Sequence, residues 1–209
     1  MANLITVSRF PLLIGIVLLL YTSSPVARLI AAALVIVSIG LDSLDGFIAR
    51  TRQEVSLMGS VLDIMADRAV ELVMWVTYAH LGLVPVAIPI IYILRGTVVD
   101  SLRSLHVGRG TAPFKGMRTR LGTWLVGSPW MRTSYALAKM ISFAGLAVAH
   151  ALAAYAVKGT VHSETVQWVQ LAFVVTSWIS VTFCLVRGVP VIIEALAPLA
   201  SVRRSARDG

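Results

Sequence analysis

The chain has 209 residues and a formal net charge of +8, but only 13% of its residues are charged and 57% are hydrophobic. A soluble domain usually carries about a quarter charged residues, whereas the mean hydropathy of +0.84 is typical of a membrane protein. The excess of positive charge therefore predicts contact with anionic lipid headgroups or phosphorylated substrates rather than with nucleic acid. The single cysteine, Cys184, excludes an intrachain disulfide.

Six apolar stretches are candidates for membrane helices, each of which needs about 20 mainly apolar residues. In chain order they are expected at about 5–21, 27–50, 59–81, 84–105, 133–156 and 166–186. The sequence thus predicts an all-α integral membrane protein with six transmembrane helices in a single domain, 1–209. A basic loop at about 106–131 and a basic tail at about 201–209 complete it.

The distribution of arginine and lysine predicts the orientation of these helices. An even number of spans places both termini on the same side of the membrane. Basic residues cluster in 50–52, 109–132 and 203–207, whereas the opposite side has little more than Arg28 and Lys158. Both termini are therefore expected to be cytoplasmic, in a protein of the cytoplasmic membrane.

Acidic residues gather in one stretch, 41–67, which runs from the end of the second helix, through the link, into the start of the third helix. Asp42, Asp45, Gly46 and Ala49 stand at i, i+3, i+4 and i+7, which is the spacing of one helix face. Two carboxylates and two small residues are therefore expected to share that face of the second helix.

The third helix repeats the pattern, because Gly59, Asp63 and Asp67 stand at i, i+4 and i+8. The short polar link between the helices makes them antiparallel neighbours, so the four aspartates are expected to converge at the cytoplasmic side. Glu54 is expected to be solvated in the link. Glu71 either lines the site or pairs with a buried arginine.

Four carboxylates in a partly apolar cavity repel one another and lose their hydration. Divalent cations relieve both costs, and ligands that are all oxygen atoms favour Mg²⁺, Mn²⁺ or Ca²⁺ over zinc. Mg²⁺ bound by carboxylates is typical of phosphate chemistry. Simple ion pairs of Asp42 and Asp45 with Arg50 or Arg95 are the structural alternative.

The spacing of these residues resembles, position for position, the signature of the CDP-alcohol phosphotransferase (CDP-alcohol phosphatidyltransferase) family. In this chain the signature reads Asp42-x-x-Asp45-Gly46-x-x-Ala49-Arg50, eight further residues, and Gly59-x-x-x-Asp63-x-x-x-Asp67.

The resemblance implies an enzyme that transfers the phosphatidyl group of CDP-diacylglycerol to a small polar alcohol and releases CMP. It implies that Asp42, Asp45 and Asp63 bind two Mg²⁺ or Mn²⁺ ions, and that Asp67 assists them and is the general base. A homodimer is common in the family. The residues that the resemblance places around the nucleotide are Asp42, Asp45, Gly46, Ala49, Arg50, Gly59 and Asp63.

Basic residues outside the signature are candidates for binding a phosphate on the acceptor alcohol. These candidates are Arg95, Arg103, Arg118, Arg120, Arg132 and Lys139. Arg95 and Lys139 lie furthest into apolar stretches, where a cation is a functional candidate unless it snorkels to the interface. The other four also fit the ordinary excess of positive charge on the cytoplasmic side.

The choice of acceptor depends on details of the resemblance. The opening "NLITVSR", with Asn3, Thr6 and Arg9, and a lysine in the fifth helix resemble phosphatidylglycerolphosphate synthases, which favours glycerol 3-phosphate.

Three positions depart from those enzymes. Ile64 and Arg68 follow the third and fourth aspartates where Pro and Lys are usual, and Gly96 stands where Glu is usual. An arginine after the fourth aspartate resembles inositol-type members, so inositol phosphate or inositol remains the alternative acceptor.

Two other classes of function fit the sequence less well. An ion-coupled or proton-coupled transporter would spread its carboxylates across the membrane depth, whereas here they crowd at one side. A family member that only binds lipid would be expected to have a broken signature, and the signature is intact.

Overall fold

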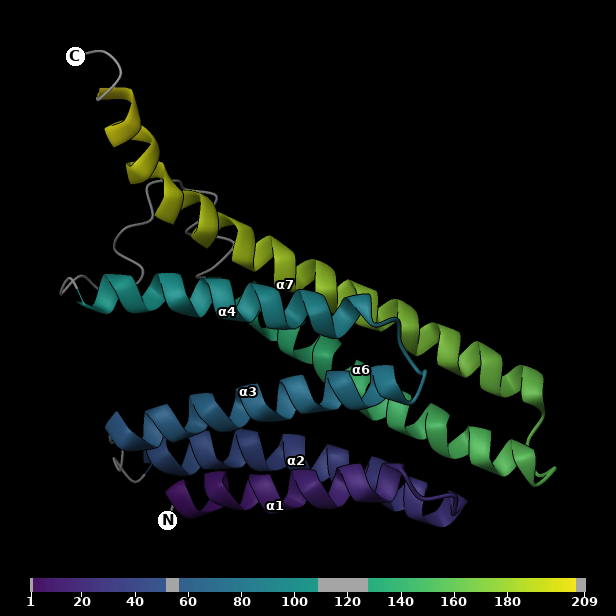
Figure 1. The fold of residues 1–209 in the computed structure, drawn as a ribbon. Helices are drawn as coiled ribbons and strands as arrows, with labels where there is room; N and C mark the ends of the chain where they lie inside the picture. Colours follow the sequence, from purple (N-terminus) through teal and green to yellow (C-terminus); the bar gives the residue numbers. More distant parts are fainter. Residues whose placement is uncertain (1, 52–56, 109–127, 206–209) are drawn as a thin grey trace. The chain divides into compact units, whose positions relative to one another are not determined.

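The computed structural model describes residues 2–51, 57–108 and 128–205, and in these ranges the chain is helical apart from short turns (Figure 1). The prediction of an all-α protein is confirmed for this part of the chain. Its helices are α1 (Ala2–Leu20), α2 (Pro25–Thr51), α3 (Leu57–His80), α4 (Ala87–Gly108), α6 (Pro129–Val157) and α7 (Ser163–Ser205).

Two helices begin with the same local signal, a serine followed by a proline. Ser24 precedes Pro25 at the start of α2, where its Oγ accepts a hydrogen bond from the amide of Ala27 at 3.5 Å. Ser128 precedes Pro129 at the start of α6, and its carbonyl accepts from the amide of Arg132. Proline suits the first helical position because its missing N–H would have no partner there.

Two turns between helices depend on glycine. Gly82 and Gly159 follow α3 and α6 with φ of 71° and 74°, a conformation that costs glycine nothing. After α3, the amide of Leu83 bonds the carbonyl of Tyr78 while Gly82 bonds Ala79. This pair of bonds caps the last carbonyls of the helix and turns the chain sharply.

The last helix is longer than predicted. The sequence indicates an end near 186, but α7 continues to Ser205 and so includes the first residues of the expected basic tail. Pro190 lies inside the helix. Because proline has no amide N–H, the carbonyl of Val186 lacks its usual helical hydrogen bond, but the helix does not end there.

Among the described residues, two helices are long and apolar enough to cross a membrane. They are α6 and the Ser163–Ile193 part of α7. The apolar parts of α1 and α2, Thr6–Leu20 and Pro25–Leu41, are shorter. Length and composition thus support a membrane protein.

The chain divides into two compact units. The first, called unit one, comprises Met1–Pro89 with Lys139–Ser177, and in it α1 packs against α2 and α3 (Figure 1). At its core, the buried Trp75 meets the ring of Phe143 edge-on at 4.8 Å. The hydroxyl of Tyr78 donates a 2.6 Å hydrogen bond to the carbonyl of Phe143. These contacts hold α3 against α6.

The second, unit two, comprises Ile90–Ala138 with Trp178–Gly209. Within it, the buried hydroxyls of Tyr92 on α4 and Ser180 on α7 lie 2.7 Å apart. The guanidinium of Arg187 lies over the ring of Tyr135, 5.5 Å from its centre, at a distance typical of a cation–π contact.

Candidate functional site

The second half of the acidic pattern lies on successive turns of a single helix, α3. Gly59, Asp63 and Asp67 all lie within α3, so their predicted spacing along one helix face is realised. The Asp63 and Asp67 side chains are 54% and 48% exposed. Both carboxylates can therefore be reached from outside the protein core.

A buried arginine from the first helix lies beside Asp63. Arg9 is only 3% exposed in its side chain, and its Nη1 lies 3.8 Å from Oδ1 of Asp63. Because α1 packs directly against α3, the guanidinium can approach the acidic face from inside the unit. Arg9 therefore supplies a positive charge to one side of this face.

Glu71 lies one turn beyond Asp67 and is buried, with 2% of its side chain exposed. Its Oε2 accepts a 2.8 Å hydrogen bond from Nη1 of Arg68, and its Oε1 accepts a 3.2 Å bond from Nζ of Lys139. Of the two alternatives predicted for Glu71, pairing with cations is therefore found, although its arginine partner is partly exposed.

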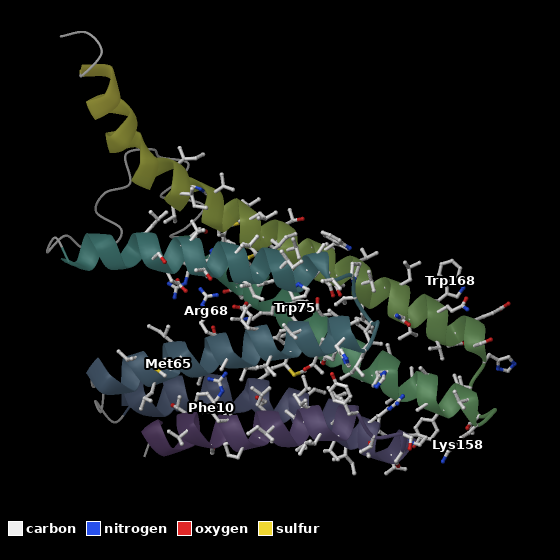
Figure 2. All side chains as sticks on the ribbon, viewed as in Figure 1. Phe10, Met65, Arg68, Trp75, Lys158 and Trp168 are labelled. Carbon is white, nitrogen blue, oxygen red and sulfur yellow. The ribbon has the colours of Figure 1, made fainter. Side chains whose placement is uncertain are left out.

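Lys139 of α6 connects this buried acid to the exposed acidic face. Its ammonium lies 3.2 Å from Glu71 and 3.6 Å from Oδ1 of Asp67. Figure 2 places Arg68 on α3, between Met65 and Trp75. Unit one thus brings together a ladder of ion pairs, which we call the α3 ladder: Arg9–Asp63, Lys139–Asp67, Lys139–Glu71 and Arg68–Glu71.

The first half of the acidic pattern lies on α2. The backbone there is helical through Thr51, as the predicted spacing requires. The side chains of these residues lie outside the part of the chain that the structure describes, so their convergence with α3 remains a prediction. They are Asp42, Asp45, Gly46, Ala49 and Arg50. Glu54 lies outside the described residues entirely.

Of the six candidates for binding an acceptor phosphate, Lys139 is the one found in the α3 ladder. Arg132 is exposed in the first turn of α6. Arg103 lies on α4 with an undescribed side chain, and Arg118 and Arg120 lie outside the described residues.

Arg95 of α4 belongs to unit two and packs closely on α7. A Cβ built on Gly188 would lie 2.7 Å from Nε of Arg95, so glycine at this position makes room for the Arg95 side chain. The Arg95 Nε is buried, and no hydrogen-bond partner for it is found among the described atoms. Its role as a ligand for the acceptor phosphate stays a prediction.

The donor atoms on α3 fit a hard divalent cation. Asp63 and Asp67 offer carboxylate oxygens, the ligands that Mg²⁺ and Mn²⁺ prefer. Within the described residues, no group of three or more acidic, histidine or cysteine side chains forms a ligand set. The two other predicted ligands, Asp42 and Asp45, have side chains outside that description, so the complete site rests on the sequence pattern.

Three contacts of the ladder are not predicted by the sequence, namely Arg9–Asp63, Lys139–Asp67 and Lys139–Glu71. The sequence singles out Arg9 only through the N-terminal resemblance, and Lys139 only through the resemblance and as a phosphate ligand. The available signal is a cation inside an apolar helix, which usually has a specific partner. The partner itself depends on how α1 and α6 pack on α3, which spacing within one helix does not reveal.

Comparison with known proteins identifies one family. The family model described as CDP-alcohol phosphatidyltransferase matches residues 1–176. This match covers the four aspartates, Arg9 and Lys139, and it confirms the resemblance drawn from the signature.

Two curated relatives are similar to this chain over shorter segments. Both are named CDP-diacylglycerol--glycerol-3-phosphate 3-phosphatidyltransferase. The protein of Bacillus subtilis (strain 168) is 31% identical over 102 residues, which is 49% of this chain and 53% of the relative. The protein of Rickettsia bellii (strain RML369-C) is 36% identical over 66 residues, 32% of this chain and 36% of the relative. The matched segments thus span about half or less of the relatives' own lengths.

Proposed function

We propose a reaction for this chain, starting from the fact that it belongs to the CDP-alcohol phosphatidyltransferase family. The chain transfers the phosphatidyl group of CDP-diacylglycerol to glycerol 3-phosphate and releases CMP. The observation that carries the proposal is the family match over a region in which Asp63 and Asp67 lie accessible on one helix.

In this reaction, a hydroxyl oxygen of the acceptor attacks the phosphorus atom that carries the diacylglycerol. A new P–O bond forms to the acceptor, and the P–O bond to the CMP phosphate breaks. The hydroxyl proton must go to a base, and CMP leaves with the electron pair of the broken bond. The chemistry therefore needs charge stabilisation at the pyrophosphate and a base at the acceptor.

Asp67 is the proposed base, in agreement with the role that the family resemblance implies. Its carboxylate is about half exposed and lies 3.6 Å from the Lys139 ammonium. A water-soluble acceptor can therefore approach it. Asp42, Asp45 and Asp63 are proposed to bind Mg²⁺ or Mn²⁺ together with Asp67, and the metal would stabilise negative charge on the pyrophosphate oxygens. Gly46, Ala49, Arg50 and Gly59 complete the proposed nucleotide site.

A phosphorylated acceptor is favoured by the position of Lys139. An ammonium beside the proposed base would pair with an anionic group on the acceptor and bring its hydroxyl close to Asp67. The names of both relatives specify glycerol 3-phosphate as the acceptor of those proteins. Inositol phosphate is the second candidate, because Arg68 follows Asp67 as in inositol-type members.

The proposed location is the cytoplasmic membrane, with six spans, both termini in the cytoplasm and the site at the cytoplasmic side. Its support is the apolar length of α6 and α7, together with the basic clusters of the sequence. Exposed tryptophans such as Trp168 on α7 (Figure 2) suit the membrane–water interface.

The test is an acceptor panel. The purified protein in detergent is mixed with CDP-diacylglycerol, Mg²⁺ or Mn²⁺ and one alcohol at a time, and CMP release is followed. Glycerol 3-phosphate is expected to give the fastest release, and faster release with inositol phosphate would replace it as the acceptor. No CMP with any alcohol would refute the proposed reaction, and ion flux in liposomes without CMP formation would support the transporter instead.

A further inference from the structure

Glu71 stands outside the family signature, yet its carboxylate is buried and bound at both oxygens. Oε2 binds Arg68 of the same helix at 2.8 Å, and Oε1 binds Lys139 of α6 at 3.2 Å. A buried carboxylate is unfavourable unless it is paired and hydrogen-bonded. This arrangement therefore ties α3 to α6 with charges whose positions are closely defined.

Lys139 depends on such a partner for its position. A lysine ammonium sits on a flexible four-carbon stem and carries three rotatable donors, so its location is set by what it binds. Its contact with Asp67 is longer, at 3.6 Å, and Asp67 is about half exposed to screening solvent. The shorter contact with the buried Glu71 therefore holds the ammonium more firmly than the contact with Asp67 does.

We propose that Glu71 is a positioning residue, which fixes the Lys139 ammonium beside Asp67 where it binds the phosphate of the acceptor alcohol. This inference rests on the proposed function. Glu71 itself does not touch the acceptor, because its carboxylate is buried and both oxygens are bonded to the protein. It acts through Lys139, and so determines the affinity for a phosphorylated acceptor rather than for CDP-diacylglycerol.

The test uses variants that separate charge from shape. Glu71→Gln keeps the size of the side chain, but its neutral amide must turn an N–H group toward Arg68 or Lys139. Glu71→Asp keeps the charge and shortens the reach by one methylene. Lys139→Met removes the ammonium. Two exposed residues of unit one give matched controls, Glu164→Gln in the first turn of α7 and Lys158→Met in the turn before it.

The kinetic result expected is a selective loss. Glu71→Gln should raise the KM for glycerol 3-phosphate about tenfold or more, because a misplaced ammonium loses a hydrogen bond to a charged phosphate. The KM for CDP-diacylglycerol should change less than about twofold, and Glu71→Asp should recover part of the loss. The Glu71→Gln/Lys139→Met double variant should match Lys139→Met alone, because residues that act as a unit are not additive. Equal rises in both KM values, or additive effects, would overturn the inference.

A binding measurement keeps the inference separate from turnover. Glycerol 3-phosphate and, in parallel, inorganic phosphate should raise the unfolding temperature of the wild-type protein and of both controls, because a ligand stabilises the state that binds it. Glu71→Gln and Lys139→Met should lose most of this shift. An undiminished shift in Glu71→Gln overturns the inference, even if the wild-type protein releases CMP as proposed. If the wild-type protein releases no CMP and Glu71→Gln loses the shift, the proposed reaction is refuted, and Glu71 is shown only to position Lys139 for a phosphate group.

Discussion

Gly145 provides a test of how closely α6 and α7 pack within unit one. A Cβ at this position would overlap the ring of Phe173, including its Cγ atom near the backbone, so the ring cannot simply swing aside at its far end. By contrast, a Cβ at Gly15 in α1 would meet no described atom within 4 Å. The two glycines therefore form a matched pair for the same substitution to alanine.

The expected magnitudes follow from two opposing effects. Replacing glycine by alanine inside a helix is favourable by about 1 kcal/mol, and forcing an extra carbon into a packed contact costs about 1–3 kcal/mol. Gly15→Ala should thus stabilise the protein by up to about 1 kcal/mol. Gly145→Ala should destabilise it by up to about 2 kcal/mol, so that the two variants differ by about 1–3 kcal/mol.

Thermal unfolding in detergent, followed by circular dichroism, measures this difference. Phe173→Leu should relieve the overlap, so the Gly145→Ala/Phe173→Leu double variant should be more stable than the sum of the two single changes predicts. If Gly145→Ala is as stable as Gly15→Ala, the close approach of α6 and α7 at this point is refuted.

Four further predictions concern the candidate site. Asp67→Asn should lower CMP release by about 100-fold or more, since it removes the proposed base, while nucleotide binding persists; near-normal turnover would remove Asp67 from that role. Gly59→Leu should weaken binding of the CDP-lipid by filling the proposed nucleotide space, whereas unchanged affinity would place the nucleotide elsewhere. Arg9→Gln should reduce turnover about tenfold through its contact with Asp63, with Arg9→Lys less affected; equal loss in both would show that the charge is not what matters. EDTA should stop CMP release, with recovery in Mg²⁺ or Mn²⁺, and activity that persists in EDTA would exclude metal dependence.

The helices themselves were largely predictable because each depends on a local run of apolar residues. The structure adds the signals at their ends, such as Ser24–Pro25 and Gly82. The end of α7 was not predictable in the same way. The apolar stretch ends near 186, but the helix continues, because a single missing hydrogen bond at Pro190 does not outweigh a helix that continues on both sides.

In the candidate site too, the features within one helix were predictable, and the contacts between helices were not. Placing Gly59, Asp63 and Asp67 along one helix needed only the helical repeat, and the structure contains that helix. The bridge from Lys139 to Asp67 and Glu71 joins residues 68 to 72 positions apart, so it depends on the packing of α6 against α3. No periodicity within one helix contains that information, which is why the sequence left two alternatives open for Glu71.

The α3 ladder also bears on how the protein is assembled. Its three carboxylates, Asp63, Asp67 and Glu71, are matched by the three cations Arg9, Arg68 and Lys139. Within the described residues, the ladder therefore carries equal numbers of positive and negative side chains. Charge pairing within the polypeptide thus offsets part of the cost of placing these carboxylates on an otherwise apolar helix.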